Sequence, residues 1–276
     1  MYTIKNDKLQ VVVKSFGAEL NSIKKINSDY EYLWQGDPAY WKRQAPILFP
    51  IVGRLLEDSY TYLDDSYSMT QHGFARDSEF TCVESLSDSV LFKLVSSDSS
   101  LEKYPFAFEL YLGYELVSDY IKVTYKVVNM DSKVMPFSIG AHPAFNWDKS
   151  LEAKFSFPDQ VVSSCLVSSK GIVEGPEVSL VDTLLTESLF DNDALIYKAL
   201  NSTTFMNGEI GIEMNFDGFP YVGLWSLPTG APFVCIEPWY GIGDYSDHNQ
   251  NILNKEGMIS LNTGEVFEAF YTIKPI

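Results

Sequence analysis

The chain has 276 residues, of which 46% are hydrophobic, and its 37 acidic and 20 basic side chains give a formal net charge of -17. This apolar fraction is typical of a globular protein, and the length suffices for one large all-β domain or two smaller domains. A surface this acidic repels nucleic acid and anionic membranes, so neither is an expected partner. The sequence leaves a homodimer open.

Alternation of apolar and polar residues dominates the chain. Between Ile121 and Val127 the odd positions are apolar and the even positions polar, which is the pattern of a half-buried strand. The preceding β-rich run and the turn residues between the two predict a hairpin. In chain order, strands are expected at Lys8–Ser15, Tyr60–Leu63, Phe80–Val83, Val90–Leu94, Phe108–Val117, Ile121–Val127, Ile210–Phe216, Val222–Ser226, Phe233–Ile236, Met258–Leu261 and Phe267–Ile273.

Helical periodicity is almost absent. The segment Asp37–Trp41 predicts one helical turn capped by its first residue, and Thr186–Leu189 predicts another. Glycine and proline break the segment Ser163–Asp193, which is expected to be a long excursion from the sheets. Many short strands between turn residues favour an all-β fold, a large antiparallel β-sandwich. Because no linker or repeat interrupts the pattern, residues 1–276 are expected to form a single domain.

The cysteines and the N-terminal residues indicate in which cellular compartment the protein is expected. Cys82, Cys165 and Cys235 share no spacing typical of a metal site, so neither a disulfide framework nor a zinc site is expected. The first residues lack the apolar run of a signal peptide, and no stretch approaches the roughly 18 apolar residues of a membrane span. We therefore expect a cytoplasmic protein.

Two of the three histidines lie in unusual stretches, 71–76 and 140–146. The neighbours of His72 leave two interpretations open: a core histidine bonded to a backbone carbonyl, or a site residue. Pro143 removes a backbone donor and drives His142 out of a strand ladder, which a structural histidine would not need. A functional role is therefore favoured for His142. The third, His248, stands in a polar loop and is expected to be exposed.

Glu237 follows the apolar run Phe233–Ile236 and precedes Pro238 and Trp239. A carboxylate at the end of such a strand is either a surface residue or a partly desolvated base, and desolvation raises a carboxyl pKa towards the range of general base catalysis. Trp239 offers a flat apolar wall for the C–H face of a sugar ring, with core packing as the alternative.

Arg54 is an isolated cation in the apolar run 50–55. Buried arginine is rare unless it is paired, so Arg54 is expected to meet a carboxylate or ligand oxygens. Asp193 lies in an Asp/Asn turn and by itself indicates capping or solvation. The chain has no Gly-rich phosphate loop, nucleophile elbow, zinc-helix motif or nucleotide-binding βαβ pattern, which disfavours kinases, serine hydrolases and dehydrogenases.

Four motifs, in their order and spacing, resemble the aldose 1-epimerase (galactose mutarotase) family, and in particular a shorter bacterial branch associated with lactose and galactose utilisation. They are Gly53-Arg54, His72-Gly73-Phe74, His142-Pro143-Ala144-Phe145-Asn146 and Glu237-Pro238-Trp239. The resemblance covers essentially the whole chain. It implies a large antiparallel β-sandwich that interconverts the α and β anomers of a free hexose, with no cofactor and no metal.

The resemblance also implies roles for individual residues. They are Glu237 as general base, His142 as general acid, His72 and Arg54 as contacts to the sugar, and Asp193, or alternatively Asp191, as the substrate-binding aspartate. Phe74 replaces a glycine of better-known members and is expected to narrow the site. Related members act on hexose 6-phosphates, and all three arginines of this chain lie between positions 43 and 76. A phosphorylated sugar therefore stays open, as do a non-catalytic carbohydrate-binding or regulatory module and a glycosidase, which usually needs two facing carboxylates.

Overall fold

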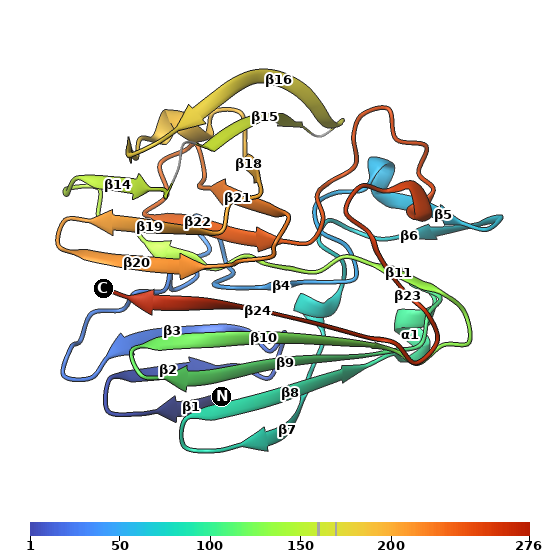
Figure 1. The fold of residues 1–276 in the computed structure, drawn as a ribbon, viewed down its shortest axis with the longest axis horizontal. Helices are drawn as coiled ribbons and strands as arrows, with labels where there is room; N and C mark the ends of the chain where they lie inside the picture. Colours follow the sequence, from blue (N-terminus) through green and yellow to red (C-terminus); the bar gives the residue numbers. More distant parts are fainter. Residues whose placement is uncertain (159–160, 169) are drawn as a thin grey trace.

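Antiparallel strands dominate the regular secondary structure of the protein, a computed structural model that describes residues 1–158, 161–168 and 170–276 (Figure 1). Within those ranges the only α-helix is α1 (Asp98–Leu101), and the 3-10 helices are short. They are η1 (Leu56–Asp58), η2 (Ala75–Asp77), η3 (Glu187–Phe190) and η4 (Ile252–Asn254). The all-β fold class expected from the sequence is confirmed. No helix in these ranges has both the length and the apolar character needed to cross a bilayer.

A nine-stranded sheet forms one side of the sandwich. Its strands, in spatial order, are β17 (Thr183–Leu184), β14 (Ala153–Ser156), β19 (Ser202–Asn207), β20 (Ile210–Asn215), β24 (Val266–Pro275), β10 (Tyr120–Asn129), β9 (Phe108–Val117), β8 (Ser89–Val95) and β7 (Thr81–Ser85). The β9–β10 hairpin was expected from the alternation, and it pairs in continuous register from Tyr120 opposite Val117 to Asn129 opposite Phe108. Its alternate side chains enter the core, which removes their apolar surface from water.

A second, six-stranded sheet positions the site. It contains β18 (Leu195–Lys198), β21 (Tyr221–Trp225), β22 (Phe233–Trp239), β12 (Gly140–Ala141) and β4 (Ile47–Leu48), with β13 (Ala144–Asn146) also paired to β22. Every residue of β22 is buried. Because side chains alternate along a strand, Val234 and Ile236 enter the main core, whereas Cys235, Glu237 and Trp239 share the opposite face.

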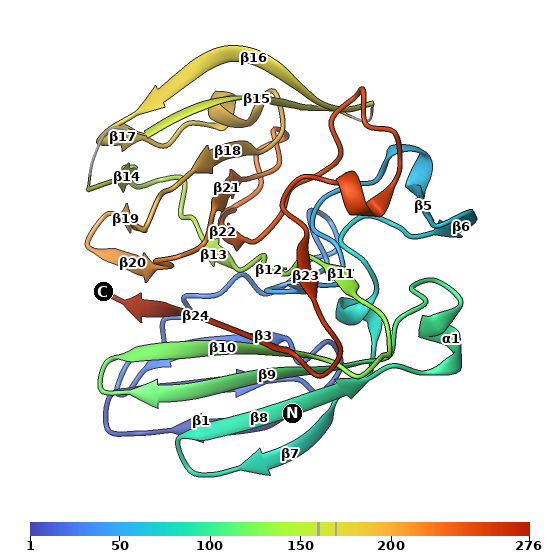
Figure 2. The same ribbon diagram turned by 45° about the vertical axis from the view of Figure 1, so that its right-hand side comes forward.

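Smaller sheets complete the fold (Figures 1 and 2). They are β1 (Tyr2–Lys5), β2 (Leu9–Val13) and β3 (Leu20–Lys25); the pair β5 (Ser59–Tyr62) and β6 (Asp65–Ser68); the pair β11 (Met135–Phe137) and β23 (Ile259–Leu261); and the pair β15 (Val161–Ser168) and β16 (Gly171–Leu180). In both views the β15–β16 hairpin arches over β18, β21 and β22, and β15 contacts β18. The second sheet therefore has the main core on one face and this hairpin above the other.

Two local expectations from the sequence need correction. The segment Ser163–Asp193 is largely the β15–β16 hairpin, followed by β17 and η3. Its two strands pair on both sides of a register shift at Gly175 and Pro176, so these residues interrupt the pairing without ending it. Glu237 lies inside β22 and not at its end, because the strand continues to Trp239. The helical turn at 37–41 is confirmed: the Trp41 backbone N–H donates to the Asp37 carbonyl over 3.0 Å.

Candidate active site

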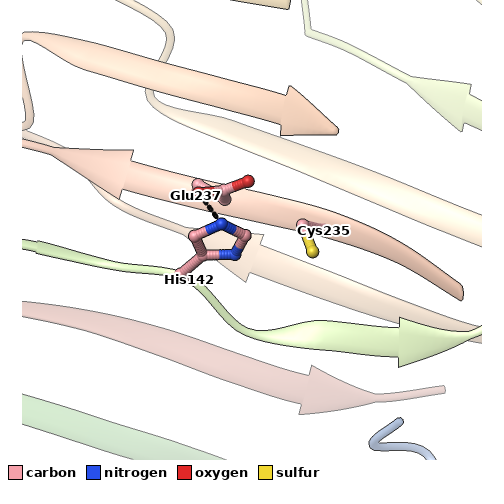
Figure 3. A group of neighbouring side chains, drawn as sticks. All are labelled: His142, Cys235 and Glu237. Atoms are coloured by element: carbon pink, nitrogen blue, oxygen red, sulfur yellow. Dashed lines mark ion pairs between the residues drawn. The ribbon is translucent and has the colours of Figure 1, made fainter. Parts of the chain in front are cut away.

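His142 and Glu237 are brought together by strand register. Gly140 of β12 pairs with Trp239, and Ala144 of β13 pairs with Cys235, so the residue midway between them, His142, stands opposite Glu237. The ladder is interrupted there, as expected from Pro143. His142 Nε2 lies 3.2 Å from Glu237 Oε2, the contact drawn in Figure 3.

These two side chains line a cavity of about 490 Å³, called here the site pocket. Its volume falls in the range of small-molecule sites. All six site residues expected from the sequence line it: Glu237, His142, His72, Arg54, Asp193 and Trp239. Asp191 is exposed and is not among the lining residues, so of the two aspartates left open, Asp193 is the one at the pocket.

Burial determines the protonation of the facing pair. Glu237 is 1% exposed and His142 is 8% exposed. Burial, with a smaller contribution from Asp193, raises the pKa of Glu237 well above its ordinary value. Burial, reinforced by Arg76, lowers the pKa of His142 to about 3. The environment thus disfavours a charge on either group, which favours a protonated Glu237 carboxyl beside a neutral imidazole over a carboxylate beside an imidazolium.

His72 is a buried residue that also lines the site pocket. Its Nδ1 accepts a hydrogen bond from the Gly53 backbone N–H over 3.1 Å, so its partner is an amide and not the carbonyl of the core interpretation. That bond places the ring proton on Nε2, which makes Nε2 a donor. The ring meets the His142 ring edge to face at 5.6 Å. Burial, with His142 next in effect, lowers the pKa of His72 well below its ordinary value, so the ring is neutral.

Arg54 and Asp193 occupy more open positions. Arg54 is exposed where it lines the site pocket, so the burial expected for it is wrong, whereas its expected meeting with a carboxylate or ligand oxygens stays a prediction. The apolar run that motivated the expectation of burial contributes Ile51, Val52 and Leu55 to the interior. Asp193 also keeps an exposed side chain, yet the surrounding protein raises its pKa, opposed by a hydrogen bond with the Trp225 side chain.

Three tryptophans form the aromatic part of the site pocket. Trp41 stacks on the His142 ring with centroids 4.8 Å apart, and Trp225 meets the same ring edge to face at 5.5 Å. Trp239 is 5% exposed, and its Nε1 donates to the Ala141 carbonyl over 3.2 Å. Sequence reasoning missed Trp41 and Trp225, because no local pattern connects them to His142.

Arg76 is a further lining residue that sequence reasoning left without a role. One guanidinium nitrogen, Nη2, donates to the Gln71 carbonyl over 2.5 Å. Its Nε is buried and has no hydrogen-bond partner within the described ranges. Burial, with Arg43 next in effect, lowers the pKa of Arg76 to about 10. In the sequence Arg76 stood out only as a neighbour of His72 and as one of the three arginines that left a phosphorylated sugar open.

A buried ion pair holds the backbone next to Arg54 in place. Lys255 Nζ lies 2.9 Å from Asp244 Oδ1, and both side chains are at most 1% exposed. The Asp244 backbone N–H donates to the Arg54 carbonyl, and Asp244 Oδ2 accepts from the Leu56 backbone N–H. His248 Nδ1 lies 3.3 Å from the same Oδ2, and its side chain is only 11% exposed, so the expected exposed histidine is wrong.

Phe74 does not narrow the site pocket, contrary to the expectation from the sequence. It is absent from the lining residues, and its ring packs towards Tyr104 and Phe108, with centroids 6.5 and 6.2 Å away. The chain turns at Gly73, which has a φ of +70° and whose added Cβ would lie 2.2 Å from the Phe49 carbonyl oxygen. This turn sends the next side chain into the core.

The fold and the site pocket define a class of protein. A galactose mutarotase related enzyme from Lactobacillus acidophilus superposes with a TM-score of 0.95 at 32% identity, over 100% of this chain and 97% of that chain. A galactose mutarotase-like protein from Lactobacillus casei ATCC 334 superposes with a TM-score of 0.93 at 29% identity, over 100% of both chains. The protein is thus a galactose mutarotase-like β-sandwich.

The chain belongs to the aldose 1-epimerase family, whose model matches residues 1–188. The LacX proteins of Lactococcus lactis subsp. lactis, plasmid and chromosomal, are each 34% identical over 284 residues, covering 93% of this chain and 93% of theirs. The resemblance found in the motifs, including its lactose-associated bacterial branch, is confirmed. Membership of this family places the protein among carbohydrate epimerases.

Proposed function

We propose that the protein is a mutarotase that interconverts the α and β anomers of a free hexose. The observation that carries this proposal is the 3.2 Å contact between His142 Nε2 and Glu237 Oε2 at the site pocket. Mutarotation removes a proton from the anomeric hydroxyl and delivers one to the ring oxygen, and both oxygens are bonded to the same carbon. Two proton-transfer groups side by side match that demand.

In this proposal Glu237 is the general base and His142 the general acid. The ring opens, the aldehyde end rotates about the C1–C2 bond, and the reverse transfers close the ring on the other face. His72, with its Nε2–H, is assigned to the sugar hydroxyls, together with Arg54 and Asp193. Trp239 supplies an apolar wall for the C–H face of the ring. Each well-placed proton transfer contributes on the order of 10²–10⁴-fold.

For Glu237 to act as base and His142 as acid, the proton that they share must first move from Glu237 to His142. Burial of the free site favours the proton on Glu237, whereas the reaction as assigned starts from a carboxylate and an imidazolium. Both states carry a single proton and no net charge. Hydrogen bonds donated by sugar hydroxyls to Glu237 favour the carboxylate, and this shifts the proton towards His142 when the sugar binds.

A phosphorylated hexose is the second candidate substrate. Arg54 and Arg76 both line the site pocket, and the buried Nε of Arg76 has no hydrogen-bond partner among the described residues. Guanidinium groups suit phosphate oxygens, since they present several donors in one plane. The same two groups would then open and reclose the ring of a hexose 6-phosphate bound in this pocket.

Polarimetry of freshly dissolved sugars tests both candidates. A panel of α-glucose, α-galactose and their 6-phosphates is followed with the wild-type protein and with Arg76→Gln. Acceleration of the free sugars supports the first candidate, and acceleration of the phosphates alone, lost in Arg76→Gln, supports the second. Calorimetric binding of galactose without faster mutarotation would favour a non-catalytic module, and release of nitrophenol from nitrophenyl glycosides would favour a glycosidase.

A further inference from the structure

Cys235 is a buried thiol beside the facing pair, and the proposed acid–base reaction does not use it. It lies on β22 two residues before Glu237, so both side chains leave the strand on the same face. It is free and 0% exposed. One potential ligand atom from each of His142, Cys235 and Glu237 lies within 4.8 Å of the other two (Figure 3).

Polar atoms of the facing pair lack hydrogen bonds. His142 Nδ1 is buried and has no hydrogen-bond partner within the described ranges. Glu237 Oε2 is also buried there without a hydrogen bond, and its close polar neighbour is His142 Nε2 at 3.2 Å. Burying a polar atom without a partner is costly, so such atoms mark a place where a ligand is expected. The side chains that carry them are at least nine-tenths buried and meet at the site pocket.

We propose that His142, Cys235 and Glu237 form an inhibitory binding site for a soft divalent cation of the zinc type. Imidazole nitrogen, thiolate sulfur and carboxylate oxygen are the donor set that Zn²⁺ prefers. Ligand atoms about 2.0–2.3 Å from one zinc ion stand less than about 4 Å apart. The three ligand atoms reach that spacing if they move about an ångström closer together. The fourth coordination position of the ion would then face the site pocket.

Occupation of this site stops the proposed reaction without any change of fold. The ion displaces the thiol proton of Cys235 and the proton that His142 and Glu237 share, both of which are released to solvent, and it then binds the thiolate, the imidazole and the carboxylate. Neither His142 nor Glu237 can then exchange a proton with a sugar. Hard, oxygen-preferring cations such as Mg²⁺ lack this match, because a thiolate and an imidazole are poor ligands for them. The inhibition part of this inference rests on the proposed function, whereas the binding part does not.

Metal binding is measured first, without reference to activity. The full-length protein is titrated with Co²⁺ and followed by the thiolate-to-metal charge-transfer absorption, and with Zn²⁺ in competition with a chelating dye. Wild type and Cys82→Ser, which removes a free and only partly buried thiol on β7, are expected to bind one ion with the thiolate band. Cys235→Ser is expected to lose the band and to weaken Zn²⁺ binding by more than the roughly 10–100-fold that loss of a supporting hydrogen bond costs. Cys235→Ala provides a second variant if the serine does not fold.

Inhibition is measured next, with wild type, Cys82→Ser and Cys235→Ser. Zn²⁺ in micromolar amounts is expected to suppress mutarotation by wild type and Cys82→Ser and to leave Cys235→Ser active. The site is overturned if wild type fails to bind Zn²⁺, or if Cys235→Ser and Cys235→Ala both bind Zn²⁺ as tightly as wild type does. A protein that binds Zn²⁺ as expected but never accelerates mutarotation retains the metal site and loses the proposed function, so the two failures are distinguishable.

Discussion

His142 and Glu237 face each other across an interrupted antiparallel ladder, with their nearest side-chain atoms 3.2 Å apart. The interruption at Pro143 frees the His142 backbone from pairing while the register on both sides is kept. The imidazole is further held by Trp41, stacked on one side at 4.8 Å. A rigid sheet thus fixes the distance between two groups that must exchange protons, and this is the preorganisation that catalysis requires.

The buried carboxyl of Glu237 should cost stability. Its folded pKa lies above the unfolded value, so its stabilising contribution is complete below about pH 4.5 and is lost as pH rises through the folded pKa. Glu237→Gln removes this dependence. We expect the variant to be inactive and yet more stable than wild type at pH 8, by about 1 kcal/mol or more, or about 2–4 °C in Tm.

Thermal unfolding at pH 5 and pH 8 checks this expectation, with Glu209→Gln as the control because Glu209 is exposed. The advantage of Glu237→Gln should grow with pH, whereas the control should follow wild type. An equal or lower Tm for Glu237→Gln at pH 8 contradicts the burial argument.

The two site histidines should stay neutral under mildly acidic conditions. Their folded pKa values are lowered, to about 3 for His142, so the stability they contribute is present above about pH 6.5 and is lost as pH falls from there. Each contributes a slope of up to about 1.4 kcal/mol per pH unit in that window. With only three histidines in the chain, imidazole NMR signals can be assigned by His72→Asn and His142→Asn. Titration of either ring near pH 6.5 in the folded protein would count against the account.

The Lys255–Asp244 pair should be important for stability and for the position of Arg54. Lys255→Met leaves the Asp244 carboxylate buried beside an apolar chain, and breaking a buried pair in this way costs about 3–5 kcal/mol. The double variant Lys255→Met, Asp244→Asn should recover part of that loss, because no unpaired charge remains. Urea denaturation of the single and double variants gives the comparison. A double variant as unstable as Lys255→Met, or less stable, is inconsistent with this role.

Sugar binding should be visible in tryptophan fluorescence, since three of the five tryptophans line the site pocket. Galactose is expected to change the emission of wild type and of Trp147→Phe, whose tryptophan lies outside the pocket, and to change that of Trp41→Phe less. Trp41→Ala should also lower kcat/KM by up to about tenfold, the equivalent of one aromatic contact. An identical fluorescence response in Trp41→Phe and Trp147→Phe would place the sugar elsewhere.

Alternation predicts most clearly the strands that bury one face. In β9 and β10 alternation alone determines the register, because a shift by one residue would expose the apolar set. Short strands lack this signal, and β12, β13 and β18 were missed for that reason, whereas β21 and β22 were predicted from their apolar runs. The β15–β16 hairpin was missed because its glycines and proline imitate a loop.

The candidate site was predictable only in part, for a similar physical reason. Gly and Pro beside His142, and an apolar run before Glu237, are local features that a sequence carries. The stacking of Trp41, the exposure of Arg54 and the meeting of Cys235 with His142 depend on pairing between distant strands. Spacing along the chain puts Cys235 and Glu237 on one face of a strand, but it could not indicate that His142 meets them, because that contact depends on the β12–β13 and β22 register.

The most direct test of the central claim is the exchange rate between the two anomers of galactose at equilibrium, measured by two-dimensional exchange NMR. It is measured with wild type, Glu237→Gln and His142→Asn, each shown to be folded by circular dichroism. The account predicts fast exchange with wild type and a rate at the spontaneous level, within about tenfold, with either variant. Wild-type exchange in either folded variant would contradict the assignment of this pair.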